Sequence, residues 1–255
     1  MKLDVVFAPT FLEEDELGGW VCAVVDVLRA TSTIITALVS GAVAVYPCLE
    51  IAEARRRSES FQQGSCLLGG EERGDRIPGF DLGNSPLEYL AENIIAGKVI
   101  CFYTTNGTGA IRRAYVHSGQ PIYIAALLNI SAVSSAMVRA ASAGHARGIV
   151  ILCSGRYGRP SAEDLFCAGL IVERIGIGLR EVGIVPQLTD GAGIAAGYAA
   201  ANKEQSLEVL ASSEHGRFLL SLGFASDLEF ASQMDVYNTV PTFDGERVVL
   251  LHGDC

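Results

Sequence analysis

The chain has 255 residues, with 19 basic and 29 acidic side chains and therefore a formal charge of −10. Such an excess of negative charge argues against a nucleic-acid partner, because binding a phosphate backbone needs a surplus of cations. Hydrophobic residues make up 49% of the sequence, which indicates a globular protein with a large core. The length suits a single domain spanning 1–255, or two small ones that divide near residue 190.

Two long stretches without charged side chains, 30–49 and 114–138, raise the question of a membrane span. Glycine and proline interrupt both, so we expect a buried helix and a buried strand in each instead. The apolar run after Met1 is too short for the core of a signal peptide. The seven scattered cysteines contain no C-x-x-C pair and are expected to be reduced thiols. We therefore expect a cytoplasmic protein that does not bind membranes.

Strand and helix patterns alternate along the first two thirds of the chain. Continuous runs of Val, Ile, Ala and Cys predict strands buried on both faces at 20–27, 43–46, 99–103, 122–125 and 149–153. Helical patterns lie between them at 31–39, 51–61, 86–95, 109–117, 131–143 and 161–181. This alternation predicts βαβ units and a three-layer α/β/α fold with a mainly parallel sheet.

The last third of the chain has a different character. Ala-rich and Leu-rich helical segments follow residue 191, and a β-hairpin is predicted from 239–243 and 247–251 around Asp244-Gly245. We expect the antiparallel strands of this hairpin at one edge of the sheet, which would make the sheet mixed.

Three predicted strands run into short polar loops that open a helix, at 26–33, 104–109 and 153–159. The carboxyl ends of parallel strands share one edge of a sheet, where α/β proteins build their sites. The N–H groups at a helix N-terminus favour an anion such as phosphate or sulfonate. Ser, Thr, Asn and Gly are also ordinary helix caps, so a structural role stays open for each loop alone. Together the loops predict a shared anion pocket.

The segment 69–86 combines four carboxylates and two arginines with several glycines. Asn84 or Ser85 is expected to cap the helix that Pro86 begins. Hard oxygen ligands close to arginines are what a magnesium phosphate site requires. A solvated charged loop is the alternative reading of this segment.

These segments, taken together, resemble the 2-phosphosulfolactate phosphatases, magnesium-dependent enzymes that release sulfolactate on the route to coenzyme M. The similarity is carried by V-D-V-L-R-A-T at 25–31, G-F-D-L-G-N-S-P at 79–86 and T-T-N-G-T at 104–108, with weaker blocks at 70–71, 153–155 and 161–164. The resemblance implies an α/β/α fold, dependence on Mg²⁺ and hydrolysis of a small anionic phosphomonoester. The substrate it implies carries a phosphate, a sulfonate and a carboxylate.

The resemblance leads to a hypothesis about individual residues. Mg²⁺ is placed against Asp26, with Glu71 or Asp81 as further ligands. Arg29 and Arg73 are expected to hold the anionic groups. The haloacid-dehalogenase phosphatases use an aspartate as the nucleophile and have a second aspartate two residues further on. In this chain the position two residues after Asp26 is Leu28, so a nucleophilic Asp26 is disfavoured. The expected substrate cradle consists of Thr105, Asn106, Gly107, Thr108, Ser154 and Gly155.

Glu163 and Asp164 divide between two interpretations. Ser161 and Asp164 form a capping-box pattern at the start of a predicted helix. Either acid could instead bind the metal or give a proton to the leaving alkoxide. The four histidines have no recognisable metal or triad spacing and are expected at the surface or at caps: His117, His145, His215 and His252.

Two rival functions stay open. Cys153 and Arg159 have the C-x₅-R spacing of metal-independent cysteine phosphatases, although an inert buried thiol is the simpler expectation for Cys153. A non-catalytic module that only binds a small anion would keep the phosphate loops but lack the set of metal ligands. The number of subunits is not encoded in any of these patterns, so a homo-oligomer is an open outcome.

Overall fold

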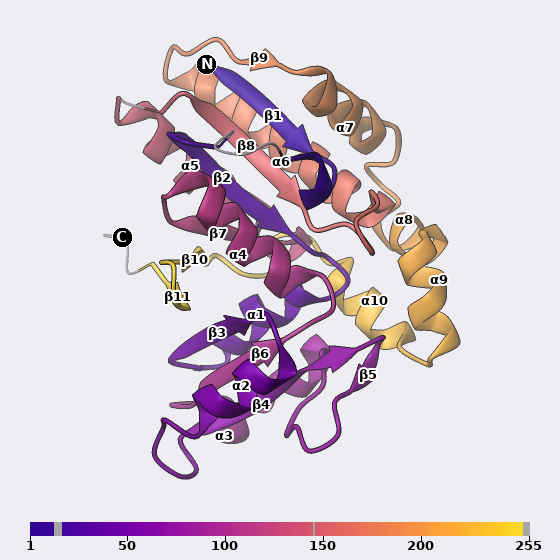
Figure 1. Cartoon of the computed structure of the whole chain (residues 1–255). Coiled ribbons are helices and arrows are strands. Elements are labelled where there is room, and N and C mark those ends of the chain that lie inside the picture. The colour runs from indigo at the N-terminus through magenta and orange to yellow at the C-terminus, as the bar shows by residue number, and fades with distance from the viewer. Residues whose placement is uncertain (13–16, 145, 252–255) are drawn as a thin grey trace.

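The structure is a computed structural model that describes residues 1–12, 17–144 and 146–251. Within these residues, eleven strands form one sheet in the order β5-β4-β6-β3-β11-β10-β7-β2-β8-β1-β9, with helices on both sides (Figure 1). The predicted α/β/α fold with a mainly parallel, mixed sheet is therefore confirmed.

The five strands predicted for the core of the sheet are all present, with ends that differ by one or two residues. The strands are β1 (Lys2–Val6), β2 (Trp20–Val25), β3 (Ala44–Cys48), β4 (Cys66–Glu72), β5 (Asp75–Arg76), β6 (Val99–Tyr103), β7 (Ile122–Ala125), β8 (Gly148–Cys153), β9 (Gln187–Leu188), β10 (Pro241–Phe243) and β11 (Val248–Leu250). The α-helices are α1 (Ala30–Val39), α2 (Ile51–Ser58), α3 (Glu92–Ile95), α4 (Gly107–Ser118), α5 (Ile130–Ser142), α6 (Ala162–Glu181), α7 (Asp190–Ala201), α8 (Ser206–Ser212), α9 (Glu214–Ser221) and α10 (Ala225–Ala231). Short 3-10 helices span Pro9–Phe11, Pro86–Tyr89 and Leu127–Asn129.

The predicted hairpin exists, but its expected position at an edge of the sheet was wrong. β10 and β11 lie in the middle of the sheet, between β7 and β3. The turn residues fix the hairpin itself, whereas its place in the strand order depends on which long-range edges are left unpaired. The hairpin pairs with one edge of each neighbouring strand and so joins two groups of parallel strands.

The two groups run in opposite directions along the sheet. One group contains β7, β2, β8, β1 and β9, and the other contains β3, β6 and β4. β7 is antiparallel to β10, β10 to β11, and β11 to β3, which reverses the direction between the groups. Figure 1 shows the groups as an upper and a lower unit, with the hairpin between them on the left.

Several elements were missed by the sequence analysis. The segment 69–86 is not a plain loop, because β4 extends into it and pairs with β5 as a short antiparallel hairpin. The helix predicted over 86–95 is broken into a 3-10 helix and α3. Tyr89 is fully buried and its hydroxyl donates to the Gly83 carbonyl at 2.8 Å, which holds this first turn against the preceding loop.

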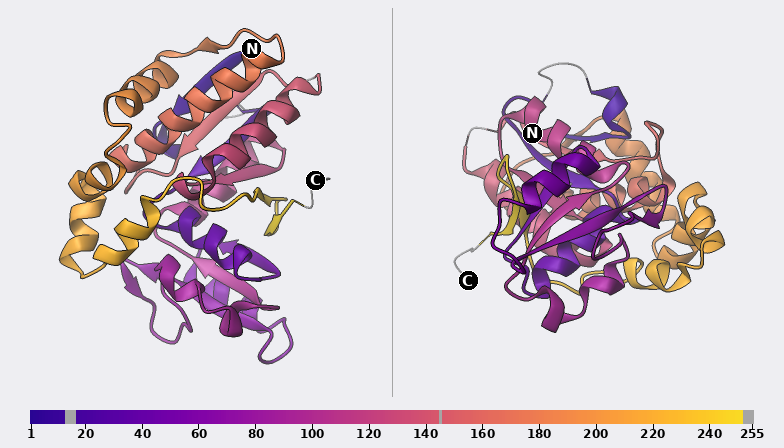
Figure 2. Two further views of the ribbon diagram at one scale, coloured as in Figure 1. Left: turned by 180° about the vertical axis from the view of Figure 1, so that it is seen from behind. Right: turned by 60° about the horizontal axis from the view of Figure 1, so that its bottom comes forward.

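Alternate side chains of β2 enter two different cores. Ala23 and Val25 pack with α5, α6 and α7, whereas Cys22 and Val24 belong to a second core that includes α1 and α4. The two cores lie on opposite faces of the sheet. In Figure 1, α4 lies in front of β2. In the view from behind, α5 and α6 lie in front of the strands (Figure 2, left). Burial on both faces explains the uninterrupted apolar runs of these strands.

The two uncharged stretches are each divided between elements, as expected. Residues 30–49 form α1 and β3, and residues 114–138 include the end of α4, β7 and most of α5. Among the residues that the structure describes, no helix combines the length and apolar character needed to cross a membrane.

The central hairpin supplies a test of the fold. Phe243 is fully buried and its ring meets Tyr115 edge to face, with ring centroids 5.5 Å apart. Phe243→Ala should lower the free energy of unfolding by about 3–5 kcal/mol, because it leaves a cavity where the two strand groups join. Urea denaturation measures this loss. Leu251→Ala, at a side chain that is 49% exposed, is the matched control and should change stability little.

Candidate active site

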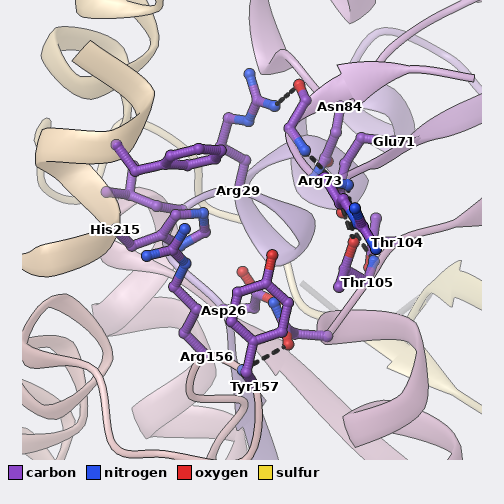
Figure 3. Close-up of a pocket in the computed structure, with 14 residues that line it drawn as sticks. Asp26, Arg29, Glu71, Arg73, Asn84, Thr104, Thr105, Arg156, Tyr157 and His215 are labelled. Atoms are coloured by element: carbon purple, nitrogen blue, oxygen red, sulfur yellow. Dashed lines mark hydrogen bonds between the residues drawn. The ribbon is translucent and has the colours of Figure 1, made fainter. Parts of the chain in front are cut away.

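The segments that follow β2, β4 and β6 meet at one pocket near the carboxyl ends of these strands (Figure 3). About 360 Å³ of space lies within it, part of which is open to solvent. The residues predicted from the sequence that line it are Asp26, Arg29, Glu71, Arg73, Thr105 and Asn106. Segments far apart in the chain therefore converge, although they come from strand groups of opposite direction rather than from one parallel edge.

Asp26 directly follows β2 and is 6% exposed. Its N–H donates to Thr31 Oγ1 at 3.0 Å, and the Ala30 N–H donates to its Oδ1 at 3.2 Å, so the start of α1 fixes the carboxylate. Burial raises the pKa of Asp26 to about 6, against the lowering effect of the nearby His215 and of the Ala30 N–H. A carboxyl group that titrates close to neutral pH in a pocket is a candidate for chemistry.

The N-terminus of α4 lies beside Asp26. A Cβ at position 107 would be 2.5 Å from Asp26 Oδ2 and 2.4 Å from the Ala30 Cβ, so glycine permits this approach. Asn106 at the N-cap makes no side-chain cap, because its Oδ1 accepts the Tyr157 N–H at 3.0 Å. The Thr108 N–H donates to Thr104 Oγ1 at 3.2 Å, so the part of α4 that borders the pocket is its N-cap at Asn106, at the positive end of the helix dipole.

Glu71 connects two loops on the other wall of the pocket. Its Oε1 accepts the Thr105 N–H at 2.8 Å, and its Oε2 accepts the Gly74 N–H at 2.6 Å and the Thr105 hydroxyl at 3.2 Å. The Arg73 N–H donates to Thr105 Oγ1 at 3.3 Å, and the exposed Arg73 side chain lines the pocket. Both oxygens of Glu71 accept hydrogen bonds, so this carboxylate positions Arg73 and Thr105.

Seven predicted residues do not line the pocket, namely Asp81, Gly107, Thr108, Ser154, Gly155, Glu163 and Asp164. Asp81 is exposed, and its carboxylate accepts the Leu68 N–H at 2.8 Å on the outer side of β4. Thr108 and Ser154 are buried, and the Ser154 hydroxyl lies close enough to Asp26 to lower the pKa of that acid. Gly155 is also buried, and its N–H donates to the carboxylate of Asp164.

Arg29 lines the pocket but its guanidinium is engaged. Its Nη1 is 2.8 Å from Asp227 Oδ2, and its Nη2 donates to the Gly74 carbonyl at 3.0 Å. The guanidinium carbon lies 4.1 Å from the centre of the Phe224 ring. Arg29 and Asp227 are 3% and 2% exposed, so this is a buried ion pair between the β2–α1 loop and α10. Nothing in the sequence pattern singles out Asp227.

Two predicted helix caps are not formed. Ser85 makes no cap, because its hydroxyl donates to Asp227 at 2.6 Å, and Asn84 lines the pocket with Oδ1 unpaired within the described residues. Ser161 likewise donates to Asp164 at 2.9 Å instead of accepting an N–H of α6. The physical reason is shared, since a hydroxyl next to a buried carboxylate forms a stronger bond as its donor.

The two acids at the start of α6 have different surroundings. Asp164 accepts the Val27 N–H at 2.9 Å and the Gly155 N–H at 3.0 Å, so it connects the loops after β2 and β8. Burial and the neighbouring carboxylates raise the pKa of Asp164 well above its usual range. Glu163 is 1% exposed, with Oε1 3.5 Å from His215 Nδ1. Neither acid lines the pocket itself.

Arg156 and His215 line the pocket and were missed as site residues. The expectation that every histidine lies at the surface or at a cap was wrong for His215, whereas His145 and His252 lie outside the described residues. His215 comes from α9, and no spacing relates it to the loops near Asp26. Figure 3 shows the two walls of the pocket, with His215 and Arg156 on one side and Glu71, Arg73 and Thr105 on the other.

The environment of Cys153 does not suit a nucleophilic thiolate. The side chain is 1% exposed within the core and does not line the pocket. Burial raises its pKa well above the usual range, which keeps the thiol protonated. Arg159 lies in a neighbouring pocket instead. The geometry therefore disfavours a cysteine phosphatase.

Comparison with known proteins agrees with this arrangement. The family described as 2-phosphosulpholactate phosphatase matches residues 6–246. A probable 2-phosphosulfolactate phosphatase of Pseudothermotoga lettingae is 38% identical over 97% of this chain and 98% of its own length. Proteins of the same name from Symbiobacterium thermophilum and Clostridium botulinum are 40% and 32% identical, over 93% and 98% of this chain and 97% and 100% of their own lengths. The chain belongs to this family.

Membership of the 2-phosphosulpholactate phosphatase family confirms the expected enzyme class, a phosphoric monoester hydrolase.

The residues expected to bind Mg²⁺ fit that role only in part. Among the described residues, no three His, Cys, Asp or Glu side chains are arranged to hold a metal ion. Mg²⁺ in phosphate sites is often held by one or two carboxylates together with substrate phosphates, a role that Asp26 suits. Glu71 has its oxygens occupied and Asp81 lies elsewhere.

The raised pKa of Asp26 makes a testable prediction for the metal-free protein. From about pH 4 to pH 6 the folded chain holds a proton that the unfolded chain has released, so ionisation of Asp26 opposes folding. The wild-type free energy of unfolding should therefore fall relative to Asp26→Asn as the pH rises through this window. The raised pKa of Asp26 corresponds to a total change of about 3 kcal/mol in the free energy of unfolding across this window. Urea denaturation of both proteins from pH 4 to 7 measures the difference, and a constant difference would contradict the assignment.

Proposed function

We propose that this pocket hydrolyses 2-phosphosulfolactate to sulfolactate and phosphate, with Mg²⁺ as the cofactor. The observation that carries the proposal is the convergence of Asp26, the start of α4 and several arginines in one pocket. Family relatives named as probable 2-phosphosulfolactate phosphatases support the choice of substrate. The chain as a whole is negative, so these groups supply the local positive potential that a substrate with three anionic groups needs.

In this proposal the phosphoryl group binds between Asp26 and the N-terminus of α4 at Asn106. The partial positive charge of the helix N-terminus stabilises the phosphoryl oxygens, and it does so more strongly as negative charge develops on them. Asp26 accepts a hydrogen bond from the attacking water and orients it toward phosphorus. Gly107 is required for this arrangement because a side chain there would occupy the space of the Asp26 carboxylate.

Arg73 and Arg156 approach the pocket from its two walls and would bind the sulfonate and carboxylate ends of the substrate. Arg156 is held in place by the Phe218 ring, 4.5 Å from its guanidinium carbon, and by Glu214 at 3.3 Å. Guanidinium groups present planar pairs of donors that suit such oxyanions. Arg29 lies behind them and shapes the pocket through its buried pair with Asp227.

Asp26 is the residue that would hold Mg²⁺, together with oxygens of the substrate phosphate. When bound, the ion neutralises charge on the phosphoryl oxygens and so lowers the barrier to attack. The remaining expectations from the sequence stay predictions: a place in coenzyme M production, a cytoplasmic location, no nucleic-acid or membrane partner, and a homo-oligomer as an open outcome.

An anion-binding module without turnover is the second candidate function. It is kept because Asp81 lies outside the pocket and the oxygens of Glu71 are occupied, so a three-carboxylate metal set is not assembled by the described residues. Phosphate release from racemic phosphosulfolactate and from p-nitrophenyl phosphate, with and without Mg²⁺, separates the candidates. Tight binding without release would support the module.

Asp26→Asn should abolish turnover of phosphosulfolactate even in an excess of Mg²⁺, because the variant loses the charge that holds the ion and orients water. EDTA should abolish wild-type turnover, and added Mg²⁺ should restore it. Both effects are measured by release of inorganic phosphate. Near-normal activity of Asp26→Asn would remove Asp26 from the mechanism.

Arg156→Gln should raise KM for phosphosulfolactate about ten- to hundredfold, because one charge-assisted contact to the substrate is lost. The effect on kcat should be smaller, since this contact exists before and during the reaction. Initial-rate kinetics with phosphosulfolactate and with p-nitrophenyl phosphate measure the change in KM and kcat. Arg113→Gln, at an exposed position on α4, is the matched control and should leave KM unaltered.

A further inference from the structure

His215 occupies a defined position in the pocket although it belongs to the C-terminal helices. It is the second residue of α9, and its side chain is 16% exposed. The imidazole stacks on Phe218, with ring centroids 6.4 Å apart and an angle of 29° between the planes. His215 lines both the candidate active site and the adjoining pocket that contains Arg159. The ring is thus ordered by packing and still open to a bound substrate.

Glu163 is the group that faces His215 from α6. Its Oε1 lies 3.5 Å from Nδ1 of the imidazole, and the carboxylate is 2% exposed. Its Oε2 has no hydrogen-bonding partner within the described residues. Burying a carboxylate without hydrogen-bonding partners costs free energy of desolvation. An unpaired oxygen of this kind in a folded protein therefore needs an explanation, such as a functional role. The dipole of α6 stabilises some of this charge, and a cationic His215 would stabilise more.

A second carboxylate acts on the same imidazole. His215 is close enough to Asp26 to lower the pKa of that acid. The imidazole therefore lies near two carboxylates, Glu163 at 3.5 Å from Nδ1 and Asp26 in the pocket that both residues border. Because Nδ1 lies 3.5 Å from Glu163 Oε1, Nε2 is the ring nitrogen left for the pocket that His215 lines.

We propose that His215 donates a proton to the leaving oxygen of the substrate and that Glu163 positions it for this task. The inference rests on the proposed phosphatase function and deepens it. As the bond between phosphorus and the ester oxygen breaks, the oxygen takes the proton from Nε2 and leaves as an alcohol. The attacking water supplies the new oxygen on phosphorus, and neutral His215 regains a proton from solvent before the next turnover. An alkoxide is a poor leaving group, so such a donor matters for this substrate class.

Two other groups near the pocket, Asp164 and Arg29, are already engaged. Asp164 accepts three hydrogen bonds through its two carboxylate oxygens, from Val27, Gly155 and Ser161. Arg29 is paired with Asp227. His215, by contrast, lines the pocket and pairs only with Glu163 among the salt bridges of the described residues.

The test compares substrates whose leaving groups differ in their need for a proton. p-Nitrophenolate leaves as a stable anion, whereas the alkoxide of phosphosulfolactate does not. His215→Gln should lower kcat for phosphosulfolactate about 10²–10⁴-fold, the usual range for general acid catalysis. Its kcat for p-nitrophenyl phosphate should stay within about tenfold of the wild type, which also shows that the variant is folded. His117→Gln on α4, outside the pocket, is the matched control and should affect neither substrate.

Equal losses of kcat on both substrates, or no loss on phosphosulfolactate, would overturn the assignment of His215. A series of aryl and alkyl phosphates extends the comparison if phosphosulfolactate itself is not the substrate. The rate should then depend only weakly on the pKa of the leaving alcohol in the wild type and strongly in His215→Gln. If the wild type releases phosphate from no ester, the proposed function fails and the inference fails with it, whereas an active wild type with an unaffected variant removes only the inference.

Glu163 is tested as a positioning residue through its dependence on His215. Glu163→Gln should reproduce the substrate pattern of His215→Gln, with a loss of kcat on phosphosulfolactate and little change in KM. The double variant should lose no more than His215→Gln alone, because both changes remove one function. Fully additive losses in the double variant would show that Glu163 acts independently of His215.

Discussion

Arg29 and Asp227 form a buried ion pair on which the arrangement of the pocket depends. It joins the loop after β2 to α10, and Ser85 and the Gly74 carbonyl add the segments that follow β4. Removing one partner of a buried pair leaves an uncompensated charge, at a cost of about 3–5 kcal/mol. The pair therefore fixes three distant parts of the chain relative to one another. Through α10 it also fixes the adjoining helix α9, which carries His215 to the pocket.

The reversal of strand direction explains how one pocket draws on both halves of the sheet. Loops from two parallel groups would lie at opposite edges of a flat sheet that reverses in its middle. In the folded chain the groups are turned toward each other (Figure 1), so that Asp26 after β2 meets Glu71 near the end of β4 and Thr105 after β6. The C-terminal hairpin pairs with the inner edges of both groups and holds this arrangement.

Buried carboxylates near the pocket have separate physical roles. Glu71 and Asp164 accept backbone N–H groups from neighbouring loops, and these bonds determine where the loops lie. Asp26 faces the pocket, and burial moves its pKa toward neutrality. Glu163 has an unpaired oxygen and faces His215. Hydrogen bonding thus distinguishes acids that organise the backbone from acids that are free for chemistry.

Local patterns in the sequence determined the layered fold, the strands of its core and the polar loops that carry Asp26, Thr105 and Asn106. Apolar runs, turn residues and helix starts depend on near neighbours, so they can be recognised from sequence alone. Only the tertiary structure decided that the hairpin lies in the middle of the sheet, that Asp81 is outside the pocket, and that Asp227 and His215 come from the last helices to complete it. These outcomes depend on long-range pairing and burial, for which spacing along the chain carries no signal.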